Sequence, residues 1–184
     1  RELSSCPATM EASKNSDVYG LIEGHCIQQA DAPSAYTQSR LEGTDTWVGL
    51  PRDQWPDAWK GLTQPVCPLI LALYGHPDSG GYWERHCERR LLSEGFVPIS
   101  EWRSSYWHPR LKVSLIVYVD DFKMAGPIAG VKEGWDLIRK GVELGPIEEA
   151  GHYLGCDHKI TKQTSPITGK QVNTIEYDMS DFLR

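Results

Sequence analysis

The sequence predicts an α+β fold with an antiparallel sheet, and three observations lead to this prediction. Runs of strand-forming residues recur between positions 96 and 126. Two other segments, 80–94 and 130–144, repeat their apolar residues at helical spacing. A further pair of strand-like runs flanks a turn at 164–170 that contains Pro and Gly, which indicates an antiparallel hairpin. Strands and helices are therefore intermixed along the chain, as in α+β proteins.

Length and composition indicate one folded domain. The chain has 184 residues and is 40% hydrophobic, which is enough for a real core but short for two domains. We expect a single domain over 15–184, preceded by a loosely ordered lead-in at 1–14. No run of about 20 apolar residues exists, so we expect no membrane partner. No secretory leader is evident, and because the chain begins with Arg1 it reads as a piece of a longer or processed product.

Charge and cysteine content narrow the function classes. The net charge of −6 argues against a large electrostatic footprint on nucleic acid, which normally needs a basic surface. The five cysteines are odd in number and scattered, and no CxxC pair occurs, so reduced thiols are expected. A zinc site from His152, Cys156 and His158 is disfavoured because its ligands are not paired in a zinc-binding spacing.

The N-terminal half is expected to alternate short elements. Ser16 is placed to cap a short helix through Ile22. The stretch "CIQQAD" follows as a strand that ends at Asp31, and Pro33 suits the first turn of the next helix. Residues 47–60, rich in Trp and Pro, are expected to form a loop with one short strand, and "VCPLILALYG" to be a buried apolar run.

The C-terminal half carries the clearer patterns. Residues 80–94 are expected to form a helix that Gly95 ends, because Trp83, Cys87 and Leu91 share one face. The runs "FVPI", "RSSYW", "LKVSLIVYV" and "FKMAG" are expected to be strands. A helix is expected at 130–144 before Gly145. The runs "HYLGCDHKI" and "VNTIEYD" form the predicted hairpin, and "MSDFLR" is expected to begin a helix.

Two adjacent acids, Asp120 and Asp121, follow the apolar strand in "LIVYVDDFKM". Side-chain alternation puts Asp120 on the face of Tyr118, with Asp121 beginning on the opposite face unless a turn rotates it. Aspartates are common in turns and need no function there. The functional alternative is a divalent-cation site, in which the cation relieves the repulsion between the acids. Such a site needs another carboxylate at a strand end, and Asp31 supplies one.

With this hairpin, several segments in order resemble the reverse transcriptases of copia-type retrotransposons from about position 22 to 160. "YVDD" after an apolar strand resembles their catalytic hairpin, and "DAPSAY" their first catalytic segment. The further matches are an "LYG" followed by Trp eight residues after its Gly, a "GF", and an "LG". The matching residues outside the hairpin are Asp31, Ala35, Tyr36, Leu73, Tyr74, Gly75, Trp83, Gly95, Phe96, Leu154 and Gly155.

The resemblance implies a polymerase palm-like antiparallel sheet with helices packed on one face, partial fingers and an essentially absent thumb. It implies transfer of a deoxynucleotide to a primer 3′-hydroxyl with two Mg²⁺ ions, or Mn²⁺ in their place, about 4 Å apart. Asp31 and Asp120 are the expected bridging ligands, and Asp121 is a more peripheral third acid. The backbone carbonyl of Ala32 is a further candidate ligand.

The resemblance also assigns residues to substrate. Tyr36, after Ala35, holds the position of the aromatic steric gate that selects deoxynucleotides, and Tyr118 is expected near the primer end. The family usually has Gln, which helps hold nucleotide and template, where this chain has Asp78. For Tyr36 the competing interpretation is an ordinary core aromatic, and for Tyr118 a half-buried strand aromatic.

Three functions remain open at this stage. The leading one is the palm-region fragment of a retrotransposon polyprotein, with RNA or DNA template–primer, deoxynucleoside triphosphate and the remaining fingers, thumb and ribonuclease H as partners. The second is an inactive remnant, which Asp78 favours, and the third and weakest is a metal-dependent nuclease. Arg85, Arg89 and Arg90 read as a solvated helix face rather than a template contact, and Lys140 as a surface residue. The family implies cytoplasmic particles with a nuclear phase.

Overall fold

The computed structural model describes residues 7–180 of the chain. Within them the strands form a six-stranded main sheet, a three-stranded second sheet and a two-stranded arm. Neighbouring strands of the main sheet are antiparallel throughout. In spatial order its strands are β4 (Val97–Pro98), β5 (Ser105–His108), β6 (Val113–Tyr118), β7 (Asp121–Pro127), β1 (His25–Asp31) and β8 (Glu148–Glu149). The predicted α+β class and antiparallel pairing are confirmed.

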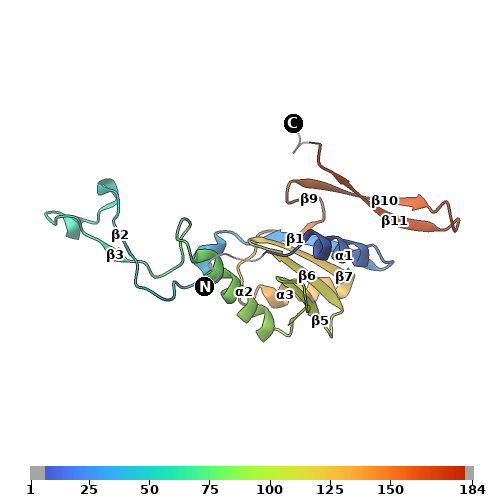
Figure 1. The fold of residues 1–184 in the computed structure, drawn as a ribbon, viewed down its shortest axis with the longest axis horizontal. Helices are drawn as coiled ribbons and strands as arrows, with labels where there is room; N and C mark the ends of the chain where they lie inside the picture. The colour runs from blue at the N-terminus through green and yellow to red at the C-terminus, as the bar shows by residue number, and fades with distance from the viewer. Residues whose placement is uncertain (1–6, 181–184) are drawn as a thin grey trace.

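The second sheet and the arm extend from the body that the main sheet forms, as Figure 1 shows. The second sheet contains β9 (His152–Tyr153), β10 (Cys156–Thr164) and β11 (Gln171–Asp178). The β10–β11 pair is the predicted hairpin, with a turn over 165–170. The arm pairs β2 (Trp47–Val48) with β3 (Cys67–Pro68) and carries the short 3-10 helices η2 (Arg52–Gln54) and η3 (Asp57–Trp59).

The α-helices among the described residues are α1 (Met10–Gly20), α2 (Ser79–Ser93) and α3 (Ile128–Ile138). A 3-10 helix, η1 (Ala35–Gln38), follows β1. The prediction for 80–94 is confirmed, with Gly95 at a φ of 92° just after α2. The predicted helix at 130–144 is present but begins earlier and ends at Ile138, shortly before Gly141, a residue of poor helix propensity.

The main core lies between one face of the main sheet and the helices α2 and α3. Alternate residues of β6 and β7 supply the sheet side, among them Leu115 and Phe122, both completely buried. Trp83 of α2 and Trp135 of α3 supply the largest helix side chains, at 2% and 1% exposure. Burial of a large apolar side chain contributes about 1.5–3 kcal/mol, so this layer holds the central strands in place.

Helix α1 covers the opposite face of the same strands, so the prediction of helices on one face only is wrong. Lys123 of β7 is completely buried there, with Nζ 2.6 Å from Asp17 Oδ1 and 2.6 Å from Ser13 Oγ. Gly20 lies so close to Ile27 that an added Cβ would stand 2.2 Å from its side chain. Helix α1 therefore approaches the sheet closely, and β6 is buried on both faces.

The N-terminal helix begins earlier than predicted. Ser16 lies inside α1 and is buried, whereas the N-cap is Thr9, whose side chain accepts a hydrogen bond from the backbone N–H of Ala12. Residues 10–14 of the expected loose lead-in are therefore helical, because Thr9 provides the capping oxygen that helix starts prefer. Residues 7–9 of that lead-in are described and precede the helix, whereas residues 1–6 lie outside the described residues, as do residues 181–184 of the predicted C-terminal helix.

The apolar run "VCPLILALYG" is not buried as predicted. Ala72 is completely buried, but Ile70 is 62% exposed and Leu71 and Leu73 are more than 40% exposed. Only Cys67 and Pro68 of the run form a strand. Pro65 and Pro68 lack the amide donors that a longer central strand requires, so the run stays in the extended arm.

Candidate functional site

The three predicted acids lie together at one end of the main sheet. Strands β1 and β7 are antiparallel neighbours, and their register places Asp31 directly opposite Asp121. Asp120 lies in the tight turn between β6 and β7, and its carbonyl accepts a hydrogen bond of 2.8 Å from the backbone N–H of Ala32. A backbone hydrogen bond thus joins the turn to the chain just after β1. This bond and the strand pairing fix the positions of the Cα atoms that carry the three carboxylates. We call Asp31, Asp120 and Asp121 the acid cluster.

The conformation of the turn sets the direction in which each acid side chain projects. Tyr118 of β6 pairs with Asp121 of β7, so Val119 and Asp120 form a two-residue loop, with Val119 at a φ of 57°. Directly opposed residues of antiparallel strands project to the same face. Asp121, and not Asp120, therefore shares the strand face of Tyr118 and Asp31, which corrects the alternation argument. A β-branched residue at positive φ is strained, and such strain is typical of functional turns.

Trp83 supports the turn from the core side. Its indole Nε1 donates a hydrogen bond of 2.7 Å to the carbonyl of Val119. The Trp83 ring is 2% exposed, so helix α2 holds the turn at a fixed depth. The carbonyl of Asp31 is likewise fixed by the N–H of Gly145, at 2.8 Å. The sequence pattern indicated Trp83 only as a core and motif residue, and nothing in it revealed either hydrogen bond.

Burial and repulsion between carboxylates make Asp31 and Asp121 hard to ionise. Burial raises the pKa of Asp121 to about 6, and the Asp120 and Asp31 carboxylates add to the shift. Burial and the Asp120 carboxylate also raise the pKa of Asp31 above its ordinary value. Both shifts disfavour the charged forms. A cation placed among these carboxylates would relieve the repulsion, which is a property expected of a cation site.

Two tyrosines accompany the acid cluster. Tyr36 of η1 and Tyr74 lie with ring centroids 4.5 Å apart. Burial raises the pKa of Tyr74, and Asp120, Tyr36 and Asp31 contribute to the shift, so this ring lies within electrostatic reach of the acids. Tyr36 itself packs at the edge of the main core, and Ala35 beside it is completely buried. The structure thus brings the predicted Tyr36 into the neighbourhood of the acids and adds Tyr74, which the sequence suggested only through its "LYG" motif.

The other predicted substrate residues differ in their placement. Tyr118 is 37% exposed and stands on the strand next to Asp121, at the acid end of the sheet. Ala32 is 1% exposed and its N–H is engaged with the acid turn. Asp78 precedes the first residue of α2, and its carbonyl accepts the N–H of Tyr82. The partial positive charge of a helix N-terminus favours an acid at such a place, which gives Asp78 a structural reason to be present.

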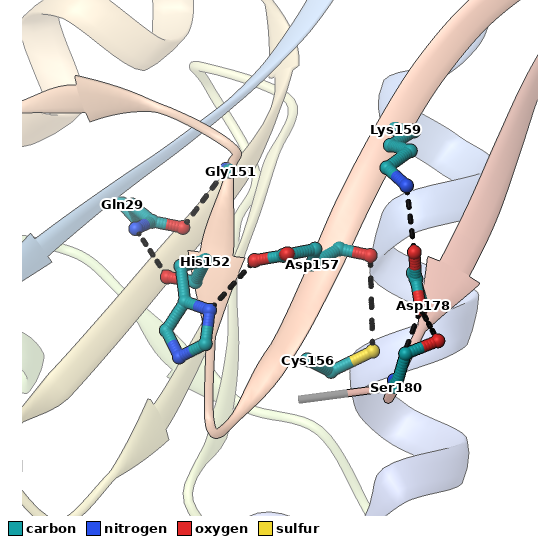
Figure 2. A network of polar contacts seen from close by, with 8 residues as sticks. All are labelled: Gln29, Gly151, His152, Cys156, Asp157, Lys159, Asp178 and Ser180. Carbon is teal, nitrogen blue, oxygen red and sulfur yellow. Dashed lines mark hydrogen bonds and ion pairs between the residues drawn. The ribbon is translucent and has the colours of Figure 1, made fainter. Parts of the chain in front are cut away.

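The second sheet is anchored beside the acid cluster. Gln29, two residues before Asp31 on the same face of β1, donates to the carbonyl of His152 at 2.8 Å and accepts from the N–H of Gly151 at 3.4 Å, as Figure 2 shows. His152 Nδ1 lies 2.7 Å from Asp157 Oδ1, so it is engaged with a carboxylate of the same sheet. The Cys156 thiol contacts the carbonyl of Asp157 at 3.9 Å.

Tyr153 of the second sheet lies within electrostatic reach of Asp121. The ring of this residue of β9 lies over the Lys123 ammonium, with 4.6 Å from Nζ to the ring centroid. Burial raises the pKa of Tyr153 far above its usual range, with Asp121, Asp17 and Tyr118 as further causes. The hydroxyl of Tyr153 is buried and has no hydrogen-bond partner among residues 7–180. The face of the sheet that bears Asp121 is therefore enclosed on one side by α1 and β9.

The acid cluster supplies the oxygen donors that a hard cation prefers, but its side chains are not arranged as a preformed metal site. Within residues 7–180, no three His, Cys, Asp or Glu side chains stand in the arrangement of a ready-made metal site. The carboxylates of Asp31, Asp120 and Asp121 nevertheless extend from adjoining backbone positions and repel one another. Carboxylate oxygens are the ligands that Mg²⁺ and Mn²⁺ prefer, so the donor set fits these ions.

Comparison of the sequence with models of protein families gives no match, and a search of curated proteins gives no similar sequence. None of the helices in residues 7–180 is long and apolar enough to cross a membrane. The functional argument therefore depends on the geometry and chemistry of the acid cluster and its neighbours.

Proposed function

We propose that the chain is the palm-region part of an RNA-directed DNA polymerase of a retrotransposon polyprotein. The observation that supports this most directly is the register that sets Asp31 against Asp121, beside a turn that carries Asp120. The resemblance and the strand-end positions of these acids predicted that they would meet although ninety residues separate Asp31 from Asp121, and a chance pair of turn aspartates would have no reason to face a third acid. The antiparallel sheet with the acid hairpin at one end is compatible with a polymerase palm.

In this proposal the residues have distinct tasks. Asp31, Asp120 and Asp121 would hold two Mg²⁺ or Mn²⁺ ions, with Asp31 and Asp120 shared between them and the Ala32 carbonyl as an added donor. When bound, the ions supply charge neutralisation at the reacting phosphate and at the attacking and leaving oxygens. Tyr36 would lie against the sugar of the incoming deoxynucleotide and exclude a 2′-hydroxyl. Tyr118 would pack near the primer end.

The substrates follow from this assignment. They are an RNA or DNA template with a primer, and deoxynucleoside triphosphates, and the remaining fingers, thumb and ribonuclease H of the polyprotein would complete the enzyme. Cytoplasmic particles, with a nuclear phase for the copied DNA, are the corresponding setting. The second candidate is an inactive remnant, which Asp78 favours because an acid facing a triphosphate is electrostatically unfavourable.

A primer-extension assay tests the proposal on the 184-residue chain. A primed RNA template, deoxynucleoside triphosphates and Mg²⁺ are supplied, and Mn²⁺ binding is measured by electron paramagnetic resonance in parallel. Loss of a group that only supports a ligand costs about 10–100-fold, so Asp120→Asn should reduce both signals by at least about 100-fold. Asp136→Asn, an exposed change of equal charge on α3, is the matched control and should reduce neither.

The two readouts separate the candidates. Mn²⁺ binding that depends on Asp120, with extension, supports the polymerase. Mn²⁺ binding that depends on Asp120 without extension leads to the same assay on a chain lengthened by the flanking fingers and thumb segments, in which extension supports the polymerase and its absence supports the inactive remnant. If Asp120→Asn leaves both signals at the level of the control, the cation site itself is refuted, and the polymerase assignment fails with it.

A further inference from the structure

The second sheet joins the rest of the protein through polar side chains. The main core of the described residues contains no residue beyond Ile147, so the second sheet adds nothing to that apolar layer. The hydroxyl of Tyr177 on β11 instead donates to Asp17 Oδ2 of α1 at 2.9 Å. We call this contact between α1, β7 and the second sheet the polar joint. It is defined by Asp17, Lys123, Tyr153, His158 and Tyr177.

His158 of β10 is the imidazole of the polar joint, and it is 8% exposed. It lies directly opposite Tyr177 in the hairpin, and the two rings meet edge to face with centroids 4.9 Å apart. Tyr153 is its second aromatic neighbour, at 6.0 Å between centroids. The Nδ1 atom of His158 is buried and has no hydrogen-bond partner among residues 7–180. Protonation would turn both ring nitrogens into donors, and a buried charged donor without an acceptor is costly.

The charges of the main body disfavour a further cation at the polar joint. Lys123 of β7 is completely buried and lies 2.6 Å from Asp17 Oδ1. Asp17, the carboxylate that α1 contributes to the joint, is thus engaged by Lys123 on one oxygen and by Tyr177 on the other. Lys14 of α1 adds a cation 5.5 Å from the centroid of the Tyr177 ring. A protonated His158 would therefore be a third cation beside a carboxylate that is already paired.

The titratable groups of the second sheet offer little compensation. Side chains alternate along a strand, so the charged residues next to His158 and Tyr177 project from the opposite face of the hairpin. These residues are Asp157, Lys159, Glu176 and Asp178. Asp157 is also engaged with His152 of β9, at 2.7 Å. Cys156 shares the face of His158, but burial raises the pKa of its thiol, which keeps it neutral.

The docked sheet therefore fits a neutral imidazole. Burial lowers the pKa of His158 from its ordinary value of 6.5, with Lys123 as the next cause, while Asp17 and Asp157 oppose the shift. When the second sheet is released, the ring meets water and binds a proton more readily. Docking is thus fully favourable above the ordinary pKa and weakens as pH falls from that value toward the lowered pKa of the docked state, because the released state binds more protons.

We propose that the polar joint is a pH-sensitive latch, in which protonation of His158 releases the second sheet from α1 and β7. Lys123 and Asp17 keep each other as partners on release, so the main body retains its buried ion pair. Release exposes Tyr153 and opens one side of the face that bears Asp121, which β9 encloses in the docked form. The latch depends on the polar joint alone and holds whether or not the proposed function is right.

Hydroxyl-radical footprinting of the full chain between pH 7.5 and pH 5 measures release, with the oxidation of each tyrosine read by mass spectrometry. Tyr153 is the reporter, because it is 4% exposed in the docked form. Tyr106 is equally buried but belongs to the main core, so it reports unfolding of the body. A pKa that differs by one unit between two states changes their ratio about tenfold. Oxidation of Tyr153 should therefore rise by about three- to tenfold at pH 5, while that of Tyr106 stays constant.

Variants identify the titrating group. His158→Phe keeps a ring in the joint and His158→Gln keeps a polar group, but neither is protonated, so both should abolish the pH response of Tyr153. Tyr106 shows in each variant whether the body is folded. His152→Gln removes a 65% exposed imidazole of the same sheet and should keep the response. Asp121→Asn should also keep it, although the pKa of Asp121 is about 6 and its carboxylate is within electrostatic reach of Tyr153.

Three results would overturn the inference. Constant oxidation of Tyr153 in the unchanged protein across the pH range would show that the second sheet is not released, whatever the variants do. A pH response that persists in both His158 variants, or that is lost in His152→Gln or Asp121→Asn, would assign the titration to another group. A parallel rise of Tyr153 and Tyr106 would show that the whole chain unfolds and that no latch opens.

Discussion

Asp31 and Asp121 face each other across two adjacent antiparallel strands, and each carries a raised pKa. Residues in this relation project from the same face of a sheet, with Cβ atoms about 5 Å apart, so like charges there destabilise the fold. The pairing of β1 with β7 in the main sheet therefore also brings these two carboxylates into mutual repulsion. This conflict between folding and site geometry leads to the first two predictions.

Removing one charge should stabilise the protein without metal. The pKa of Asp121 is raised to about 6 in the folded state, so between its ordinary pKa and pH 6 the native protein binds more protons than the unfolded chain. Stability therefore falls as pH rises through this window. Asp121 is only half-buried, and solvent screening leaves an effect of about 1 kcal/mol. Asp121→Asn should raise the melting temperature by about 2–4 °C at pH 8 and leave it unchanged at pH 4. Equal shifts at both pH values would contradict the assignment.

Cation binding should depend on pH in the opposite direction. A carboxylate must lose its proton to bind a metal, so Mg²⁺ affinity should rise by up to about tenfold per pH unit below pH 6 and level off above it. Isothermal titration calorimetry between pH 5 and 8 measures this curve. Asp136→Asn should reproduce it and Asp121→Asn should flatten it. An affinity that stays constant across the range would show that Asp121 is not a ligand.

The support of the acid turn by Trp83 can be separated from ordinary packing. Trp83→Phe keeps most of the ring but leaves the Val119 carbonyl without its donor, at a cost of about 1–2 kcal/mol. Trp135→Phe is the matched control, since it removes a comparable hydrogen bond, from the indole of Trp135 on α3 to Gln28 on β1, that does not involve the acid turn. Thermal unfolding should show similar losses for both variants. Only Trp83→Phe should weaken Mg²⁺ binding, and a similar weakening in both would assign Trp83 a packing role alone.

Local sequence pattern was sufficient to predict an element when the spacing of its apolar or turn residues matched its surroundings in the fold. Helix α2 and the β10–β11 hairpin formed where spacing and turn residues placed them. The meeting of Asp31 with Asp121 followed from motif order, although pairing register was not readable from the residues. Sequence pattern did not predict the features that depend on the conformation of a turn or on packing between distant segments. The face of Asp121 depends on a two-residue turn with Val119 at positive φ, which β-branched residues rarely adopt.

The errors at α1 and at the arm have different physical causes. Helix α1 contains buried Ser13, Ser16 and Asp17, so it shows no apolar stripe that a sequence pattern would detect. Its burial depends on Lys123 and Tyr177, which are distant in sequence. The run at 66–75 has the reverse character. Its apolar residues suggested a core, but Pro65 and Pro68 limit its strand to the short β3 of the arm, and most of the run is exposed.

The buried ion pair of α1 should be a stability determinant. Lys123 and Asp17 are both completely buried and 2.6 Å apart, so removal of one partner leaves an uncompensated charge. Lys123→Met should cost about 3–5 kcal/mol, and the double variant with Asp17→Leu should recover much of that loss because neither charge remains. Chemical denaturation of the four proteins of this cycle gives the coupling energy. Losses that simply add would show that the pair contributes no mutual stabilisation.

Asp78 offers the sharpest test of whether its acid impairs nucleotide binding. It precedes α2, where a negative charge stabilises the helix by about 0.3–1 kcal/mol, so Asp78→Gln should lower the melting temperature slightly. If its carboxylate also repels the triphosphate, the same change should lower the KM for deoxynucleotide several-fold, because a repulsion of about 1 kcal/mol corresponds to a factor of about five. Asp53→Gln, on η2 of the arm, is the control of equal charge. A lower KM in Asp78→Gln alone would locate the nucleotide near the start of α2, whereas an unchanged KM would leave Asp78 with its helix-terminal role only.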